Sequence, residues 1–350
     1  MPRKGMFAVA AALLISFVSF TASANDIDNE APAGKTERKF EFTYTATIKD
    51  APEGANQVGL WIPIPQDTKH QSIANLKVDA KTAAGEVLKP EIGVDPVHGN
   101  KMAYWHVEAV QAKGLVATLT VECKRSEVSA GDLGKARELN EQEKTDLAEY
   151  LKPNRLVLVA GTFTETANAA TKGATTPMEI AKAAYDYTVA TMKYDKPADK
   201  PGWGKGSTQW ACDAKFGNCT DFHAMIMSID RTKGVPVKFE MGFPLPPRQR
   251  PEPDGKPGNP IGGYHCWAKF YLGGVGWVPL DASEAFKNPK LKEYYFGNLT
   301  ADRIQFTTGR DVNLVPKQAA DPLNFFVYPY AEADGKPVPV EKAFAYKDLQ

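Results

Sequence analysis

The stretch that decides the fold is Gly217-Asn218-Cys219-Thr220-Asp221-Phe222-His223. Asn218 is a preferred residue for the cap position of a helix, and Asp221, three residues later, is the acid of a capping box. Apolar residues then recur at helical spacing: Phe222, Met225, Ile226 and Ile229. Gly234, followed by Pro236, supplies a stop signal. The pattern predicts a buried helix that begins at Cys219 and ends just before Gly234.

The first position of this helix places Cys219 in an environment that favours ionisation. Its sulfur would lie among backbone N–H groups that have no partner within the helix, at the positive end of the helix dipole. Both features stabilise a thiolate, so we expect the pKa of Cys219 to fall below the ~8.5 of a free cysteine. The same N–H groups can bind the oxyanion of a tetrahedral intermediate. The sequence therefore indicates a nucleophilic cysteine.

A β-hairpin farther along the chain carries a candidate base and a candidate orienting acid. Its first strand begins at His265, its second ends at Asp281, and the turn is centred on Gly274. If the loop has three or five residues, His265 lies opposite Ser283, and Asp281 is diagonally adjacent on the same face. A two-residue loop sends Asp281 to the other face unless a bulge intervenes. In the first register Asp281 orients the imidazole toward the Cys219 thiolate, which is the logic of a catalytic triad.

These motifs, in this order, resemble those of the bacterial transglutaminase-like family. They are the cysteine run quoted above, Tyr264-His265-Cys266-Trp267 and Trp277-Val278-Pro279-Leu280-Asp281-Ala282. The match extends from Pro177 to Phe286. The resemblance implies an α+β, papain-like core in which the helix bearing Cys219 packs on an antiparallel sheet bearing His265 and Asp281. It also implies thioester chemistry at an amide or peptide bond, with no cofactor.

The resemblance leaves the exact activity open. The family includes proteases, amidases and members that have lost catalysis, so hydrolysis and acyl transfer are both compatible with the motifs. A catalytically inactive envelope scaffold that binds a peptide or glycan is the alternative. In the animal enzymes of this family, a tryptophan upstream of the cysteine helps to bind the oxyanion. Trp210 and Gln209 are the candidates for that role in this chain.

The same residues permit a metal-site interpretation. Cys219 and His223 are four residues apart on the expected helix, and His265, Cys266 and Asp281 could complete a ligand set. Metal binding explains neither the capped helix start nor the strand that ends in Asp281, so we expect no bound metal. We therefore expect His223 to be an interior histidine with satisfied hydrogen bonds rather than a second base.

The N-terminus has the three parts of a secretory signal peptide. Arg3 and Lys4 precede an almost unbroken apolar run at residues 7–20, and Ala22-Ser23-Ala24 supplies a cleavage site. The run is shorter than the roughly 20 residues of a membrane span, and no later stretch is apolar for long enough. We therefore expect a cleaved signal peptide at residues 1–24, no stable membrane span, and a periplasmic or secreted location.

The balance of charged residues indicates which kinds of binding partner to expect. The chain has 42 Lys+Arg and 42 Asp+Glu. Removal of residues 1–24 takes away only Arg3 and Lys4, which leaves 40 against 42 and a net charge of −2. This balance gives no reason to expect nucleic acid or an anionic membrane surface as a partner. The partner we expect is a protein, peptide or peptidoglycan-type amide substrate.

The rest of the chain divides by its periodicity. Stretches of β-type alternation separated by turn signals lie at residues 40–48, 58–64, 102–110 and 115–128. They predict an N-terminal β-sandwich domain at residues 36–128. We expect it to be followed by a helical connector at 129–175, a catalytic domain at 176–320 and a C-terminal β extension at 321–350. Within the catalytic domain, the proline-rich loop from Phe243 to Gly263 either overhangs the cleft or is a plain surface loop.

Four cysteines raise the question of disulfides: Cys123, Cys212, Cys219 and Cys266. Alternation puts Cys123 on the inward face of a strand, where cysteine behaves as a small apolar residue. A nucleophilic Cys219 must remain free. We therefore expect either no disulfide or a single Cys212–Cys266 bond, with Cys266 directed away from the catalytic face. A Cys212–Cys219 bridge that acts as an oxidative off-switch is the competing outcome.

Overall fold

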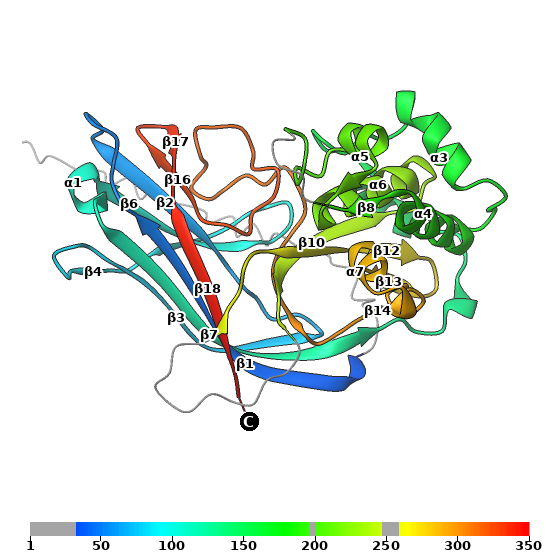
Figure 1. Cartoon of the computed structure of the whole chain (residues 1–350), viewed down its shortest axis with the longest axis horizontal. Coiled ribbons are helices and arrows are strands. Elements are labelled where there is room, and N and C mark those ends of the chain that lie inside the picture. Colours follow the sequence, from blue (N-terminus) through cyan, green and yellow to red (C-terminus); the bar gives the residue numbers. More distant parts are fainter. Residues whose placement is uncertain (1–32, 196–200, 247–258, 350) are drawn as a thin grey trace, which may run out of the picture.

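The computed structural model describes residues 33–195, 201–246 and 259–349, and it has the expected α+β architecture with antiparallel main sheets. The two larger sheets form one end of the molecule together with one short helix, Ala109–Ala112, and most of the other helices cluster at the other end beside a third sheet (Figure 1). The expected signal peptide at 1–24 lies outside the described residues, as do residues 247–258 of the proline-rich loop. Within the described ranges, every helix is too short or too polar to cross a lipid bilayer.

The largest sheet is built around the longest strand. Within the described residues it has seven strands in the order β11-β18-β1-β7-β3-β4, and β14 also pairs with β7. The strands are β11 (Asn259–Pro260), β18 (Glu341–Asp348), β1 (Ala33–Ile48), β7 (Leu115–Ser129), β3 (Gln71–Lys81), β4 (Val87–Leu88) and β14 (Asn298–Leu299). The alternation expected in β1 is present, because its inward residues are all fully buried: Phe40, Phe42, Tyr44, Ala46 and Ile48.

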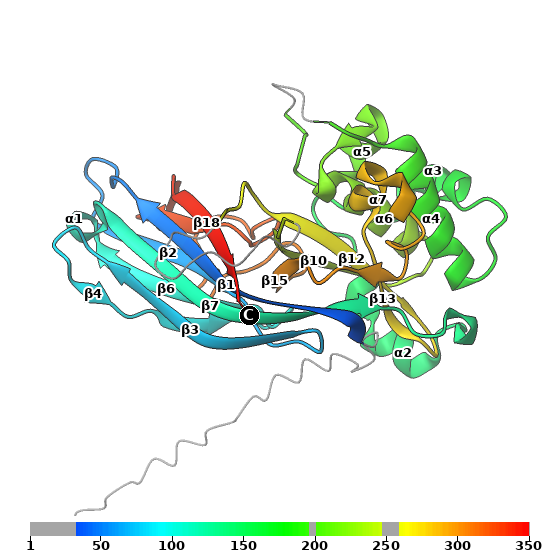
Figure 2. The same ribbon diagram turned by 60° about the horizontal axis from the view of Figure 1, so that its bottom comes forward.

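A second sheet shares the core of the first. Its order is β17-β16-β2-β6-β5. The strands are β17 (Lys336–Val338), β16 (Tyr330–Ala333), β2 (Gln57–Ile64), β6 (Lys101–Glu108) and β5 (Glu91–Val94). Buried side chains of β1 and β2 belong to one hydrophobic core. The C-terminal strands β16 to β18 enter both sheets, so the end of the chain lies beside its first described strand, as Figure 2 also shows.

The third sheet carries the hairpin that the sequence singled out. Its order is β13-β12-β10-β15, with every pair antiparallel. The strands are β10 (Val237–Pro244), β12 (His265–Leu272), β13 (Gly276–Leu280) and β15 (Arg303–Thr308). All residues of β12 and β13 are buried. A fourth, two-stranded parallel sheet joins β8 (Lys193–Tyr194) to β9 (Phe216–Gly217).

Four helices pack around α6, which is the helix predicted at Cys219. The helices of the described residues are α1 (Ala109–Ala112), α2 (Glu141–Asp146), α3 (Thr164–Ala170), α4 (Pro177–Thr191), α5 (Thr208–Ala214), α6 (Cys219–Thr232) and α7 (Ala282–Lys287). Short 3-10 turns occur at Leu133–Lys135, Ala148–Leu151, Gly161–Phe163 and Pro289–Leu291. Helix α6 contacts α3, α4, α5 and α7 on its outer sides and β10 and β12 beneath it. Its residues from Cys219 to Arg231 are therefore buried all round, and not only along the predicted apolar stripe.

An aromatic cluster fixes the third sheet against the largest one. Phe243 of β10 lies 5.2 Å from the ring of Phe42 on β1 and 4.3 Å from that of Phe344 on β18, measured between centroids. Phe306 of β15 lies 5.2 Å from Phe243 and 5.5 Å from Phe42. Aromatic pairs at these separations stabilise a contact beyond the area that they bury. The sheet that carries His265 is thus anchored on a large, rigid support.

Candidate active site

Cys219 is the first residue of α6, where the sequence placed it. The side chain of Asn218 caps the helix by accepting a hydrogen bond from the backbone N–H of Thr220 at 2.9 Å. Asp221 accepts one from the N–H of Asn218 at 3.0 Å, which completes the capping box. The Cys219 side chain is only 2% exposed. The capped start thus holds the thiol at the positive end of a buried helix.

The carboxylate of Asp221 also ties a glycine-rich turn to the start of α6. It accepts hydrogen bonds from the backbone N–H groups of Gly204 at 2.8 Å and Gly206 at 2.9 Å, in addition to that of Asn218. Gly206 has φ +62°, and Gly204 has φ +74°, a region that favours glycine. Burial raises the pKa of Asp221 to about 6, although these N–H groups oppose the shift. Asp221 therefore holds the turn at Gly204 and Gly206 against the first turn of α6, which begins at Cys219.

His265 and Asp281 meet at the end of the hairpin. Nε2 of His265 donates to Oδ2 of Asp281 at 2.7 Å. The other carboxylate oxygen accepts from the hydroxyl of Ser283 at 3.0 Å and from the N–H of Glu284 at 3.1 Å, so Asp281 also caps α7. Arg303 of β15 donates to Oδ2 at 3.2 Å. The Asp281 carboxylate is fully buried, yet its hydrogen-bonding capacity is well used.

The hairpin has the first of the two registers considered from the sequence. Leu272 pairs with Gly276, and a three-residue loop centred on Gly274, which has φ +78°, joins the strands. One expectation is corrected, because His265 and Ser283 do not form a cross-strand pair. The ladder ends where Ala268 pairs with Leu280, and Ser283 lies in α7. The strand stops early because Asp281 begins a helix, which turns the chain away from the sheet.

The electrostatics of the cluster favour a thiolate–imidazolium pair. The Cys219 sulfur accepts hydrogen bonds from His265 and from the thiol of Cys266. Burial alone would raise the pKa of Cys219, but these bonds and the charge of His265 hold it well below its ordinary value. Burial likewise opposes a charge on His265, but Asp281 and Cys219 outweigh it and raise the pKa of His265 to about 9. The same charges hold the pKa of Asp281 well below its usual range despite its burial.

His223 is an interior residue, but only one of its ring nitrogens has the hydrogen bond we expected. Nδ1 donates to the carbonyl oxygen of Cys219, four residues earlier in α6, at 2.8 Å. Nε2 lies 3.9 Å from Oδ1 of Asp281 and has no hydrogen-bond partner among the described residues. Burial holds the pKa of His223 below its ordinary value. A second imidazole, held neutral by burial, thus lies between the backbone of Cys219 and the Asp281 carboxylate.

Cys266 requires a correction. We expected its side chain to lie away from the catalytic face, free to pair with Cys212, but its sulfur lies 3.6 Å from Nδ1 of His223 and hydrogen-bonds to Cys219. Alternation does send Cys266 to the face of β12 opposite His265. That face, however, is the one that α6 covers, so it also faces Cys219. All four cysteines are free thiols, and Cys212 contacts the sulfur of Met225 instead, at 3.8 Å.

The two side chains proposed for the oxyanion both have hydrogen-bond partners. Nε1 of Trp210 donates to the carbonyl of Phe216 at 3.1 Å. Nε2 of Gln209 donates to Asp213 at 2.9 Å, on the exposed side of α5. The single N–H of the Trp210 ring is thus already bonded, and one N–H of the Gln209 amide is bonded to Asp213. The role of either residue at the oxyanion stays a prediction.

Tyr194 is a neighbour of the cluster that sequence reasoning missed. Burial, and next the negative charge of Cys219, raise the pKa of its hydroxyl. Its ring lies 6.0 Å from that of Phe222, and Nζ of Lys287 lies 4.3 Å above it. The residue belongs to the two-residue strand β8, which is too short to give a periodic signal. Only the tertiary structure brings it to the start of α6.

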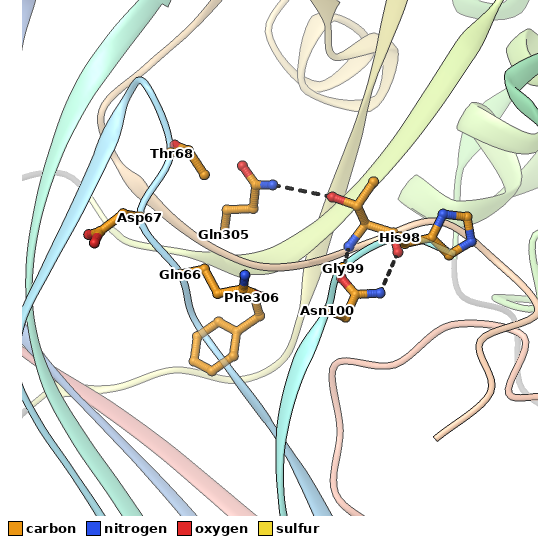
Figure 3. Close-up of a pocket in the computed structure, with 9 residues that line it drawn as sticks. Gln66, Asp67, Thr68, His98, Gly99, Asn100, Gln305 and Phe306 are labelled. Carbon is orange, nitrogen blue, oxygen red and sulfur yellow. Dashed lines mark hydrogen bonds between the residues drawn. The ribbon is translucent and has the colours of Figure 1, made fainter. Parts of the chain in front are cut away.

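A polar cavity of about 110 Å³ lies elsewhere, between the turn after β2, the turn before β6 and strand β15 (Figure 3). Asn100 donates to the carbonyl of Thr308 and accepts from its N–H, each at 2.8 Å. Gln305 donates to the hydroxyl of Thr308 at 3.4 Å. None of the candidate catalytic side chains lines this cavity, so it is separate from the Cys219 cluster. In the described part of the chain, no three His, Cys, Asp or Glu side chains are arranged to hold a metal ion.

Comparison with known proteins bears on this geometry. Residues 164–282, which include Cys219, His265 and Asp281, match the Transglutaminase-like superfamily. An uncharacterized protein of Haemophilus influenzae is 26% identical over 326 residues, covering 85% of this chain and 87% of that protein.

Solved structures share the fold at low identity. The crystal structure of a "putative cysteine protease" from Cytophaga hutchinsonii superposes with a TM-score of 0.59 at 12% identity, covering 90% of this chain and 92% of that one. A looser likeness, with a TM-score of 0.32 at 11% identity, is to the periplasmic domain of TgpA from Pseudomonas aeruginosa, over 78% of this chain and 94% of that one. The first of these shows that the arrangement of sheets and helices extends over nearly the whole chain.

Proposed function

Because residues 164–282 form a transglutaminase-like domain, we propose that this protein is a cysteine-nucleophile enzyme that acts on amide bonds through a thioester intermediate. The observation that carries the proposal is the buried chain of contacts from Cys219 through His265 to Asp281. Cys219 contacts His265, and His265 contacts Asp281, which is the order that a nucleophile, its base and an orienting acid require. Packing alone asks for no such sequence of ionisable groups in an apolar core.

In the proposed reaction the Cys219 sulfur attacks the carbonyl carbon of an amide. The S–C bond forms, and charge develops on the carbonyl oxygen. The backbone N–H of Cys219 is the candidate donor to this oxygen, since the N–H groups of Thr220, Asp221 and Phe222 bond to Asn218. His265, as imidazolium, then gives its proton to the departing nitrogen while the C–N bond breaks. A thioester on Cys219 and a free amine are the products of this half-reaction. Water or another amine resolves the thioester in the second half.

Asp281 has the position of the orienting residue. Its bond to Nε2 of His265 directs Nδ1 toward Cys219, which fixes the tautomer that the proton transfer needs. Arg303 and the cap of α7 hold the carboxylate in turn, so it cannot rotate away when His265 gives up its proton. These contacts support a rigid, prearranged site rather than one that a ligand must assemble.

The proposed substrate is a protein, a peptide or a peptidoglycan-type amide of the cell envelope. The expected signal peptide at residues 1–24 supports an envelope location. The description of the Cytophaga hutchinsonii protein as a cysteine protease is in keeping with a peptide substrate. Hydrolysis and transfer to a second amine share the same thioester, and the acceptor decides between them.

The test uses the mature protein with isolated peptidoglycan and, separately, with denatured casein, each with and without an added primary amine. New amines and ammonia are measured by fluorescence and by a coupled assay. We expect product formation by the wild type and by Cys212→Ser, and none by Cys219→Ala. If product formation persists in Cys219→Ala, the nucleophile is wrong. If the protein binds peptidoglycan equally with and without Cys219 and releases no amine or ammonia from either material, it is a binding scaffold instead.

A further inference from the structure

The candidate site contains a second thiol that the reaction does not require. Cys266 is fully buried and hydrogen-bonds through its sulfur to that of Cys219. His223 lies beside both residues: its Nδ1 is 2.8 Å from the backbone carbonyl oxygen of Cys219 and 3.6 Å from the Cys266 sulfur. Two thiols in one buried pocket, one of them ionised, are a reactive pair.

The other two cysteines are placed differently. Cys212 contacts Met225, which is six residues along α6 from Cys219 and so about 9 Å farther along the helix axis. Cys123 lies in the core of the largest sheet, where burial raises its pKa to about 12. Cys266 is therefore the thiol positioned to meet Cys219, in place of the Cys212 partner that chain proximity suggested.

We propose that Cys219 and Cys266 form a reversible disulfide when the site meets a hydroperoxide, and that this bond silences the site while sparing Cys219 from irreversible oxidation. The proposal rests on the proposed function only in requiring that Cys219 be a thiolate. Hydrogen peroxide is a fitting oxidant because a thiolate reacts with it directly to give a sulfenic acid.

The chemistry balances in two steps. The Cys219 thiolate attacks one peroxide oxygen, an S–O bond forms, the O–O bond breaks, and the departing hydroxide takes the proton of the His265 imidazolium to leave as water. The Cys266 sulfur then attacks the sulfenic sulfur of Cys219. The S–S bond forms, the S–O bond breaks, and the second hydroxide leaves as water with the proton of the Cys266 thiol. The two thiols lose two electrons, and one hydrogen peroxide becomes two waters.

Two further features favour closure over continued oxidation. The resolving thiol is hydrogen-bonded to the sulfur that it must attack and lies beside His223 of the helix that carries that sulfur, so we expect little reorganisation before the second step. The bond would also occupy the nucleophile itself, which makes loss of activity an automatic consequence. Reduction by a dithiol restores both groups, since thiol–disulfide exchange is reversible.

The experiment treats the freshly reduced protein with a small excess of hydrogen peroxide, removes the oxidant and maps peptides without reduction. We expect a Cys219–Cys266 linked peptide in the wild type and in the matched control Cys212→Ser. Dithiothreitol should return the rate of Cys219 labelling by iodoacetamide to its starting value. In Cys266→Ser and Cys266→Ala, the same treatment should leave sulfinic or sulfonic acid on Cys219, and dithiothreitol should recover none of the labelling.

The outcomes separate this inference from the proposed function. A Cys212–Cys219 link, or sulfinic acid accumulating on Cys219 equally fast in the wild type and both Cys266 variants, would overturn the pairing and leave the nucleophile intact. Inertness of Cys219 toward both peroxide and iodoacetamide would overturn the pairing and the proposed function together. The wild-type map decides the pairing even if the Cys266 variants fold poorly.

Discussion

Nε2 of His265 lies 2.7 Å from Oδ2 of Asp281, at the point where strand β13 gives way to helix α7. The contact requires two things of the chain: a three-residue turn, which sets the face of Asp281, and a helix start, which presents its carboxylate. Because Asp281 caps α7, the residue that would orient the histidine is also fixed by local structure. The strength of that coupling can be measured.

Replacing Asp281 with Asn should leave the fold intact and reduce turnover by on the order of 10⁴-fold, as loss of an orienting acid does in a serine protease triad. The amide cannot hold the imidazolium or fix the same tautomer. Glu284→Gln is the matched control, because its carboxylate lies 3.8 Å from the same Nε2 and is more exposed. The comparison is of kcat for the two variants on the amide substrate. Equal losses, or a larger loss in Glu284→Gln, would assign the orienting role to Glu284.

Alkylation of Cys219 by iodoacetamide should stay fast at pH values well below the ordinary thiol pKa. The sign follows from the lowered pKa of Cys219: the thiolate persists as the pH falls and is lost only below its depressed pKa. His265→Ala removes one hydrogen bond and the positive charge, so the whole profile should move to higher pH. A profile that does not move would mean that His265 is not the partner of the thiol.

The rates of acyl transfer and of Cys219 alkylation should depend differently on pH in alkaline solution. Transfer needs the imidazolium of His265 to protonate the departing amine, and the pKa of that group is raised to about 9. The rate of amine release should therefore decline above about pH 9, while alkylation reaches a plateau because the thiolate remains. The acidic and alkaline changes in these pH profiles are properties of the coupled Cys219–His265 pair rather than of one residue. Parallel curves, with no alkaline decline in amine release, would exclude His265 as the proton donor.

Asp221→Ala should destabilise the domain by about 3 kcal/mol or more, since three buried N–H groups lose their acceptor at roughly 1–3 kcal/mol each. Those groups belong to Asn218, Gly204 and Gly206. Urea unfolding measures the loss. Asp213→Ala is the control, because Asp213 is exposed and accepts only from Gln209 among the bonds described, so we expect a change within about 0.5 kcal/mol. Similar small losses in both variants would show that the Gly204–Gly206 turn is held by other contacts.

The parts of this protein that sequence reasoning found are those that local chemistry specifies. A capping box and a helical apolar stripe gave the start of α6, and strict alternation gave β1 and β7. The glycine-rich turn located the hairpin and left two registers open, and the structure has the one with a three-residue loop. Strand β3 was not found, because most of its residues face solvent or lie only partly buried at the sheet surface, and little alternation results.

The features that sequence reasoning missed depend on contacts between segments that are far apart in the sequence. The insertion of β18 between β1 and β11 joins the two ends of the chain, and no local pattern encodes that pairing. The position of Cys266 was misjudged although its strand face was right. Which helix covers that face is a tertiary fact, and here it is the helix that carries Cys219. Tyr194 was missed for the same reason.

The most direct test of the proposed nucleophile is to trap its acyl form. The protein is mixed with p-nitrophenyl acetate at neutral pH, quenched in acid within seconds and mapped by mass spectrometry. We predict a burst of one nitrophenolate per protein with a single acetyl group on Cys219, slower in His265→Ala and absent in Cys219→Ala. An acetyl group on any other residue at the wild-type rate, or an undiminished burst in Cys219→Ala, would contradict the assignment of Cys219 as the nucleophile.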